Sequence, residues 1–173
     1  MKKAIVIIIA VLLNPTVSLP WADIGVGYFA PAEDKTGNGY SFVVAARIAR
    51  GVNILPGVGF GVTVFRLETA SDSSDIIMPF YIEPRLYIPV DDKGKLFFHG
   101  GTALGYNVLG GYDDTCSFYA APGLGMDYWI SKTPDTPFGI SVQAKYANYR
   151  AGEDWWRFYG FEVGILAVGG CNR

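Results

Sequence analysis

The amino-acid sequence predicts an all-β fold, an eight-stranded antiparallel up-and-down transmembrane β-barrel that follows an N-terminal signal peptide. Three observations predict it. Eight segments rich in strand-forming residues are separated by seven turn-forming stretches, most segments have one apolar face, and the opposite face mixes a few charges with many small residues. The 173 residues suit a single domain.

Residues 1–22 are expected to be the signal peptide. Lys2 and Lys3 form a positive start, and Ala4 to Leu13 form a short apolar core. This core is too short to cross a bilayer as a helix. A buried N-terminal helix is the alternative, but the run lies at the very start of the chain and has no polar face.

Cleavage is expected after Ala22, which leaves residues 23–173 as the barrel domain. Cleavage after Ser18 is the alternative, because Pro20 is a poor residue at the −3 position of the first site. Without its leader the chain keeps 12 basic and 16 acidic residues, a net charge near −4. That charge gives no reason to expect a nucleic acid as partner.

The composition is unusually apolar for an exported chain. Half of the residues are hydrophobic, 15% are aromatic, 22 are glycine, and only 17% are charged, against roughly 25% in an average soluble domain. No second stretch approaches the ~18 consecutive apolar residues of a membrane helix. Together these features favour many strands that each have one apolar face.

The predicted strands cover residues 23–31, 40–50, 57–68, 76–89, 95–107, 116–130, 137–150 and 156–168. The stretches between them are EDKTGNG, GVNILPG, ETASDSSD, DDKGK, LGGYDDT, SKTPDTP and AGED. Several strands exceed the usual 5–6 residues and reach the ~9–11 that a tilted membrane strand needs. An even number of long strands joined by short turns indicates an up-and-down barrel.

Alternate residues of a strand share one face. In the second to fourth strands the apolar face consists of Tyr40, Phe42, Val44, Ala46 and Ile48, then Val58, Phe60, Val62 and Val64, then Ile76, Met78, Phe80, Ile82, Leu86 and Ile88. In the sixth to eighth strands it consists of Phe118, Ala120, Leu124, Met126, Tyr128 and Ile130, then Phe138, Ile140, Val142, Ala144 and Tyr146, then Phe161, Val163, Ile165 and Ala167. The fifth strand fits least well, since Gly100 and Thr102 dilute its apolar face.

The opposite face carries the polar residues that we expect to form a network inside the barrel: Arg47, Glu83, Arg85, His99, Asp127, Gln143, Lys145 and Glu162. Glycine, alanine and serine lie between them and leave room for the long side chains. Glycine runs such as GVGFGV alternate in strand register and lack the Gly-Lys-Ser/Thr of a phosphate loop, so they are expected to make space.

The alternation alone does not say which face points outward, and three features favour a membrane barrel. The polar face has too few charges for a solvated surface. Its charges nearly balance, with two arginines and one lysine against three carboxylates, as a narrow interior requires. Aromatic residues gather near strand ends, where interfacial girdles occur: Tyr28, Phe29, Tyr128, Trp129, Tyr146, Tyr149, Trp155 and Trp156.

With these features the chain resembles the small outer-membrane β-barrel proteins of the OmpA and OmpX type over its whole mature region. The last strand, YGFEVGI from Tyr159 to Ile165, loosely fits the pattern read by the outer-membrane assembly machinery. Such proteins usually end on an aromatic residue, whereas this chain continues to AVGGCNR. The resemblance implies the bacterial outer membrane as location, and its lipids and assembly machinery as partners of a monomer.

The expected role is structural or membrane-stabilising, with a closed lumen, short outward loops and no cofactor. A lipid-modifying enzyme of the outer membrane and a soluble exported lipid-binding barrel are the alternatives. His99 is the sole histidine, and no matching serine motif accompanies it, so we expect a structural histidine and no catalytic residues. Neither residue spacing nor ligand type suggests a metal site.

Cys116 and Cys171 are expected to remain unpaired. With both termini periplasmic, they lie at opposite ends of an apolar band ~25 Å tall, beyond the ~7 Å Cα separation that a disulfide allows. Two prolines fit the barrel less easily. Pro84 and Pro122 fall in the middle of strands, where each predicts a bulge or an unpaired carbonyl.

Overall fold

A computed structural model describes residues 21–33, 37–49, 55–68, 74–93, 95–107, 118–131, 138–151 and 154–168. It contains the strands β1 (Trp21–Pro31), β2 (Gly39–Ala49), β3 (Leu55–Glu68), β4 (Ser74–Ile77), β5 (Pro79–Pro89), β6 (Leu96–Asn107), β7 (Phe118–Ser131), β8 (Phe138–Ala151) and β9 (Asp154–Val168). Both cysteines and most of the turn-forming stretches lie outside the described residues. No helix in the part of the chain described here is long and apolar enough to cross a membrane.

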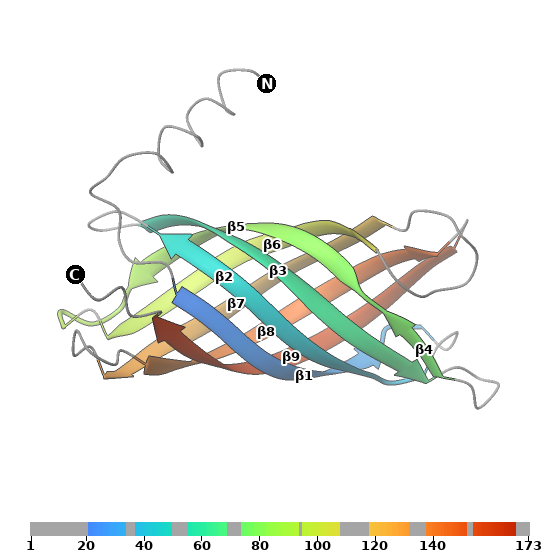
Figure 1. Ribbon diagram of the computed structural model, residues 1–173, viewed down its shortest axis with the longest axis horizontal. Helices are drawn as coiled ribbons and strands as arrows, with labels where there is room; N and C mark the ends of the chain where they lie inside the picture. Colours follow the sequence, from blue (N-terminus) through green and yellow to red (C-terminus); the bar gives the residue numbers. More distant parts are fainter. Residues whose placement is uncertain are drawn as a thin grey trace, which may run out of the picture.

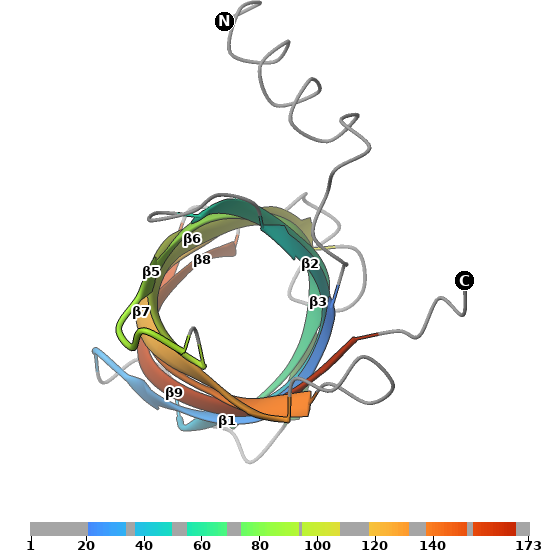
Figure 2. The same ribbon diagram turned by 90° about the vertical axis from the view of Figure 1, so that its left-hand side faces the viewer.

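The strands form one closed sheet. Each pairs antiparallel with its neighbours in the order β2-β1-β9-β8-β7-β6-β5-β3-β4, and a further pairing of β2 with β3 closes the ring (Figures 1 and 2). β4 and β5 lie along β3 in one register, because Phe65 pairs with Ile77 and Val62 with Phe80. They are therefore one barrel strand interrupted at Met78, and the predicted eight-stranded antiparallel barrel is confirmed.

At the break, the backbone N–H of Met78 is hydrogen-bonded by a side chain of the neighbouring strand. Asn107, the last residue of β6, accepts the backbone N–H of Met78 at 2.8 Å through its side-chain oxygen. The N–H that the interrupted strand leaves without a ladder partner is satisfied in this way. The predicted strand 76–89 thus continues past its break.

Both the first and the last strand reach the same end of the barrel. Trp21 of β1 pairs with Val168 of β9 there, and we call it the terminal end. At the opposite end, the far end, β1 stops at Pro31 and β9 begins at Asp154. This arrangement follows from an even number of strands joined by hairpins.

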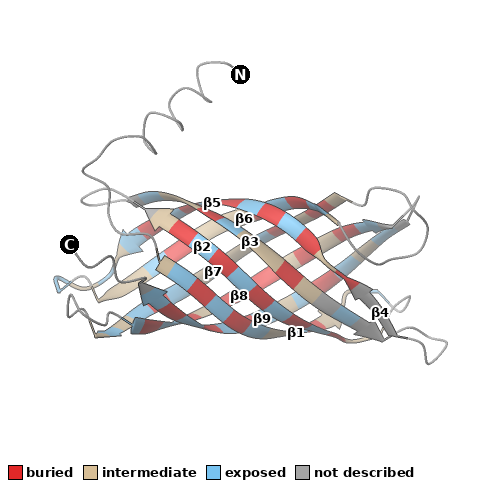
Figure 3. Ribbon diagram, viewed as in Figure 1, coloured by how far each residue is buried: buried red, intermediate tan, exposed pale blue. Residues whose placement is uncertain are grey.

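The apolar face predicted for the strands points outward. Buried residues alternate with more exposed ones along the barrel strands wherever burial is described, so that the wall appears striped in Figure 3. The exposed side of the wall holds large hydrophobic residues from all eight barrel strands, including Ile24, Phe42, Phe60, Leu86, Phe98, Leu124, Ile140 and Ile165. Charged residues at mid-strand instead face the interior, as in a barrel surrounded by hydrocarbon.

The predicted aromatic girdle is only half right. Tyr28, Tyr128 and Trp155 point outward and are exposed, whereas their chain neighbours Phe29, Trp129 and Trp156 point inward. Adjacent residues of a strand face opposite sides, so one member of each aromatic pair must enter the lumen. Tyr149 also lies inside, where it is 4% exposed.

Pro84 and Pro122 interrupt hydrogen-bond ladders without shifting their register. β5 and β6 pair at Ile82 and again at Arg85 with the same offset, but not at Pro84. In the same way β7 and β8 pair at Ala120 and Gly123 but not at Pro122. The bulge considered from the sequence is therefore absent at both prolines, because each ladder resumes in phase.

The gap at Pro122 is bridged by an amide side chain. The register places Pro122 opposite Tyr146, whose carbonyl receives no N–H from a proline. The side-chain nitrogen of Asn148 lies 3.4 Å from this carbonyl and 3.4 Å from that of Ala120. Asn148 thus supplies the donor that the proline lacks.

Replacing Asn148 by alanine is expected to lower the free energy of unfolding by about 1 kcal/mol, because a carbonyl loses its donor. In a Pro122→Ala background the backbone N–H returns, and the same replacement should then cost nearly nothing. Urea unfolding of the four members of this double-mutant cycle measures the difference. An equal cost in both backgrounds would contradict the assignment.

Candidate functional site

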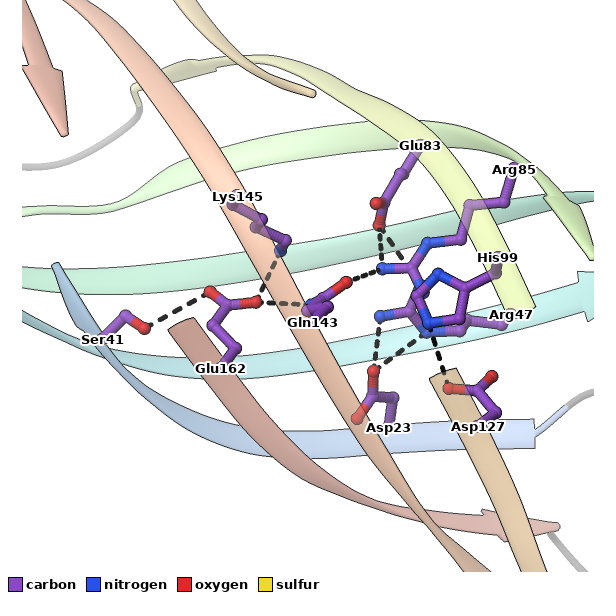
Figure 4. A network of polar contacts seen from close by, with 10 residues as sticks. All are labelled: Asp23, Ser41, Arg47, Glu83, Arg85, His99, Asp127, Gln143, Lys145 and Glu162. Atoms are coloured by element: carbon purple, nitrogen blue, oxygen red, sulfur yellow. Dashed lines mark hydrogen bonds and ion pairs between the residues drawn. The ribbon is translucent and has the colours of Figure 1, made fainter. Parts of the chain in front are cut away.

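The lumen contains a connected set of ten polar residues, the lumen network, shown in Figure 4: Asp23, Ser41, Arg47, Glu83, Arg85, His99, Asp127, Gln143, Lys145 and Glu162. All ten are buried. They include the eight residues singled out in the sequence, which the structure brings together. The inward positions of seven barrel strands hold these side chains at mid-height, and β3 adds none.

Arg47 joins two carboxylates on different strands. Its Nε lies 3.0 Å from Oδ2 of Asp23, and its Nη2 also donates to this oxygen. Its Nη1 lies 3.2 Å from Oε2 of Glu83. A guanidinium presents donors in a fixed fork, so Arg47 holds β1, β2 and β5 together across the lumen.

Arg85 is the centre of the lumen network. Its Nη2 donates to Oε2 of Glu83 at 2.8 Å and to Oε1 of Gln143 at 2.6 Å. Glu83 therefore lies between the guanidinium groups of Arg85 and Arg47 and forms an ion pair with each. Arg85 and Glu83 belong to β5 and Gln143 to β8, so the contact of Arg85 with Gln143 crosses the lumen between strands that are not neighbours in the sheet.

Glu162 collects the donors on the other side of the lumen. Its Oε2 lies 2.6 Å from Nζ of Lys145 and 2.5 Å from Nε2 of Gln143, and its Oε1 accepts from the Ser41 hydroxyl at 3.4 Å. Gln143 thus connects the Arg85 and Glu162 halves through its two amide atoms. A buried carboxylate needs such multiple partners to offset its desolvation.

His99 is fully occupied by structural contacts. Nδ1 lies 3.3 Å from Nη1 of Arg85, and Nε2 lies 3.2 Å from Oδ1 of Asp127. A guanidinium has no acceptor, so Nδ1 must accept and Nε2 must carry the proton that faces Asp127. Both ring nitrogens therefore have partners, and neither faces a nucleophile.

Two members of the lumen network, Asp23 and Ser41, were not singled out in the sequence. Asp23 changes the charge balance of the lumen network. Asp23 makes four carboxylates against two arginines and one lysine, where three against three were predicted. Asp23 borders the predicted leader, although its alternation with Ile24 and Val26 would have placed it inside. Ser41 likewise alternates with the outward residues Tyr40 and Phe42.

Glycine makes room for the lumen network. A Cβ added to Gly101 would lie 2.6 Å from Cγ of Arg85, and one added to Gly27 would lie 2.6 Å from both Glu162 and Ser41. On β3, Gly59 lies beside Arg47, with 3.5 Å between Cγ and such an added atom. A Cβ at Gly101 or Gly27 would therefore crowd the lumen network, whereas Gly59 leaves space for one.

The far half of the lumen is filled by rings and small apolar side chains. Of these rings, the sequence alone had placed only Tyr81 in the lumen, on the face that carries Glu83 and Arg85. Phe29, Tyr81, Tyr119, Tyr149 and Phe158 are buried there and form one cluster with small residues such as Ala103 and Ala121. The ring centroids of Tyr81 and Tyr119 are 6.2 Å apart. Because these rings share faces with glycines and charges, the inward face reads as polar in the sequence.

The terminal end of the lumen is also aromatic. The Trp21 ring contacts Tyr87 and Trp129, with centroids 5.6 Å and 6.1 Å apart. Tyr87 in turn lies 5.5 Å from the ring of His99. The lumen network is thus enclosed between two aromatic layers.

A small cavity borders the lumen network. A cavity of about 10 Å³ lies between Asp23, Ser141, Gln143 and Glu162. This volume is at the lower limit for a single water molecule. Among the residues with a described position, no group of three or more His, Cys, Asp or Glu side chains is placed to hold a metal ion.

Comparison with known proteins points to the fold. No protein-family model and no curated protein matches the chain at a significant level. The solved structure of Neisserial surface protein A (NspA) is similar over 88% of this chain and 99% of its own, with a TM-score of 0.54 and 16% identity. The attachment invasion locus protein Ail of Yersinia pestis matches 87% of this chain and 99% of its own, with a TM-score of 0.50 and 12% identity.

The fold is that of a small outer-membrane β-barrel. Both matches cover nearly the whole of the known barrels. At these identities the likeness concerns architecture, which confirms the predicted fold class and the resemblance. The apolar exterior and buried charges of this barrel agree with it, since they are the distribution that a bilayer demands.

Proposed function

We propose that the chain is a monomeric, non-enzymatic protein of the bacterial outer membrane whose barrel is closed and whose role is structural or membrane-stabilising. One observation carries the proposal: side chains occupy the lumen at three successive levels. These are the aromatic rings around Trp21 at the terminal end, the lumen network, and the buried rings around Phe29 in the far half. A lumen filled in this way offers no continuous aqueous path. The barrel's apolar wall then makes membrane lipids its main partner.

The lumen network supports a mechanical role. Its contacts join strands that are distant in the sequence, such as β2 with β5 and β5 with β8. Cross-lumen ties of this kind resist deformation of the barrel by the surrounding bilayer, because breaking one leaves a buried charge without its partner. The short turns expected from the sequence suit a role that needs no large receptor surface.

The alternatives have less support. A catalytic site would need an accessible histidine beside a nucleophile, whereas His99 is 1% exposed and its two nitrogens face Arg85 and Asp127. A soluble lipid-binding barrel would carry its apolar face inside, but large hydrophobic side chains cover the exterior here. Insertion into the outer membrane would involve its assembly machinery, which is expected to read the last strand.

Cell fractionation and bilayer recordings test the proposal. The protein is expected in the outer-membrane fraction, to require detergent for extraction, and to migrate differently on gels before and after boiling. In planar bilayers the folded protein is expected to show no stepwise conductance in potassium chloride. Release by salt or alkali would contradict the location, and steady conductance steps would contradict the closed lumen.

We also propose that the leader is cleaved after Ser18. β1 begins at Trp21, and the Trp21 ring packs against Tyr87 and Trp129. Cleavage after Ala22 would remove that ring from the terminal end of the lumen. N-terminal sequencing of the mature protein is expected to begin at Leu19, and a first residue of Asp23 would contradict this.

A further inference from the structure

The outer wall of the barrel contains a groove that runs across five strands. It has a volume of about 830 Å³ and lies over β2, β3, β5, β6 and the start of β7. One side is formed by a row of outward residues that pair directly across the sheet: Val44, Val62, Phe80, Tyr106 and Phe118. The other side is the parallel row of Ala46, Phe60, Ile82 and Leu104.

The floor of this wall groove is the sheet itself. Gly61, Tyr81 and Gly105 pair with one another between the two rows, and their inward orientation leaves only backbone on the outer side. At the β2 end the walls are low, because Val44, Ala46 and Val62 are small. The groove therefore has the form of a shallow channel without charged residues in its lining.

The wall groove descends from the far end of the barrel towards the terminal end. Tyr106 and Phe118 lie at the far end, next to the last residue of β6 and at the first residue of β7. Ala46 lies past the midpoint of β2, towards the terminal end, where it pairs with Ala22 of β1. With neighbouring strands ~4.8 Å apart, five strands span about 19 Å, which is comparable to an extended long acyl chain.

We propose that the wall groove binds an acyl chain of an outer-leaflet membrane lipid. The groove is continuous with the lipid-facing surface of the barrel, and its lining is apolar throughout. The groove opens at the far end of the barrel beside the hydroxyl of Tyr106. A tyrosine in this interfacial position meets the headgroup region of the lipids. The other end of the groove lies at Val44 and Ala46 of β2, within reach of an extended acyl chain that enters from the far end. The inference rests on the membrane-spanning barrel proposed above.

Spin-labelled phosphatidylcholine, with the nitroxide near the end of one chain, is the probe. The folded barrel is reconstituted in vesicles of dimyristoylphosphatidylcholine containing a trace of this probe. The wild-type barrel is expected to show a strongly immobilised spectral component that Ala46→Trp loses, because the indole fills the groove. Ala144→Trp is the matched control, since Ala144 is an exposed outward residue on β8, outside the groove, and should keep the component.

The possible outcomes distinguish failure of the groove assignment from failure of the membrane-barrel proposal. Heat-dependent gel mobility first verifies that each variant is folded, and Val62→Trp replaces Ala46→Trp if the latter fails to fold. A wild-type protein that never inserts into vesicles would refute the membrane barrel itself. Equal immobilised components in folded wild type, Ala46→Trp and Ala144→Trp would overturn the groove assignment alone. Immobilisation of spin-labelled stearic acid but not of phosphatidylcholine would overturn the assignment to a membrane lipid.

Discussion

Replacing Glu83 by glutamine is expected to lower the free energy of unfolding of the barrel by about 3–5 kcal/mol. Glu83 accepts from Arg85 at 2.8 Å and from Arg47 at 3.2 Å, and it is 1% exposed. Glutamine keeps the shape but removes the charge that separates two guanidinium groups. These groups would then remain buried with one fewer counter-charge, and water cannot reach them to compensate.

Urea unfolding of the barrel in detergent micelles, followed by tryptophan fluorescence, measures this loss. Glu33→Gln is the matched control, because Glu33 pairs with Arg157 at 2.8 Å but the two side chains are 40% and 45% exposed. An exposed pair contributes about 0–1 kcal/mol, so the control should change little. Similar losses for both variants would mean that the lumen network does not stabilise the barrel more than surface charges do.

Replacing Gly160 by alanine is expected to destabilise the barrel by about 1–3 kcal/mol, through overpacking. Gly160 pairs directly with Phe29 across β1 and β9, and the Phe29 ring lies over it. An added Cβ would collide with Cε1 of that ring. The ring is fully buried in the cluster at the far half of the lumen, so it has no free space to move into.

Gly59→Ala provides the comparison for Gly160→Ala under the same unfolding conditions. Gly59 is also a buried inward glycine, but an added Cβ would meet Cγ of Arg47 at 3.5 Å, an ordinary contact distance. Alanine there should be tolerated or should stabilise by up to about 1 kcal/mol, because it restricts the unfolded chain. A larger loss at Gly59 than at Gly160 would contradict the steric account of the inward glycines.

Much of the fold could be predicted from local patterns. Leu86 and Ile88 alternate with Arg85 and Tyr87, and this period of two divides the strand into an apolar and a polar face. The turn-forming stretches divided the chain into the same eight barrel strands. The eight polar residues could be assigned to the lumen because a charge at mid-strand cannot face hydrocarbon.

Partners across the barrel could not be predicted in this way. That Arg85 contacts Gln143, 58 residues away, depends on the diameter and stagger of the closed sheet. The contact of the Phe29 ring with Gly160 could not be predicted either, because it requires β1 to pair with β9. The sequence suggested a bulge or an unpaired carbonyl at Pro84 and Pro122, and only the pairing of the neighbouring strands shows that the register continues without a bulge.

The sequence by itself determined the barrel and its number of strands, because eight long alternating segments are separated by turn-forming stretches, and the few, nearly balanced charges of the polar face indicated that this face points inward. Only the tertiary structure decided how the lumen is filled. Rings such as Tyr81 and Phe158 occupy its far half, and the lumen network occupies the middle, because closure brings together inward positions that lie far apart in the chain. The wall groove also depends on tertiary structure. Its two rows of outward side chains form only because five strands pair in register.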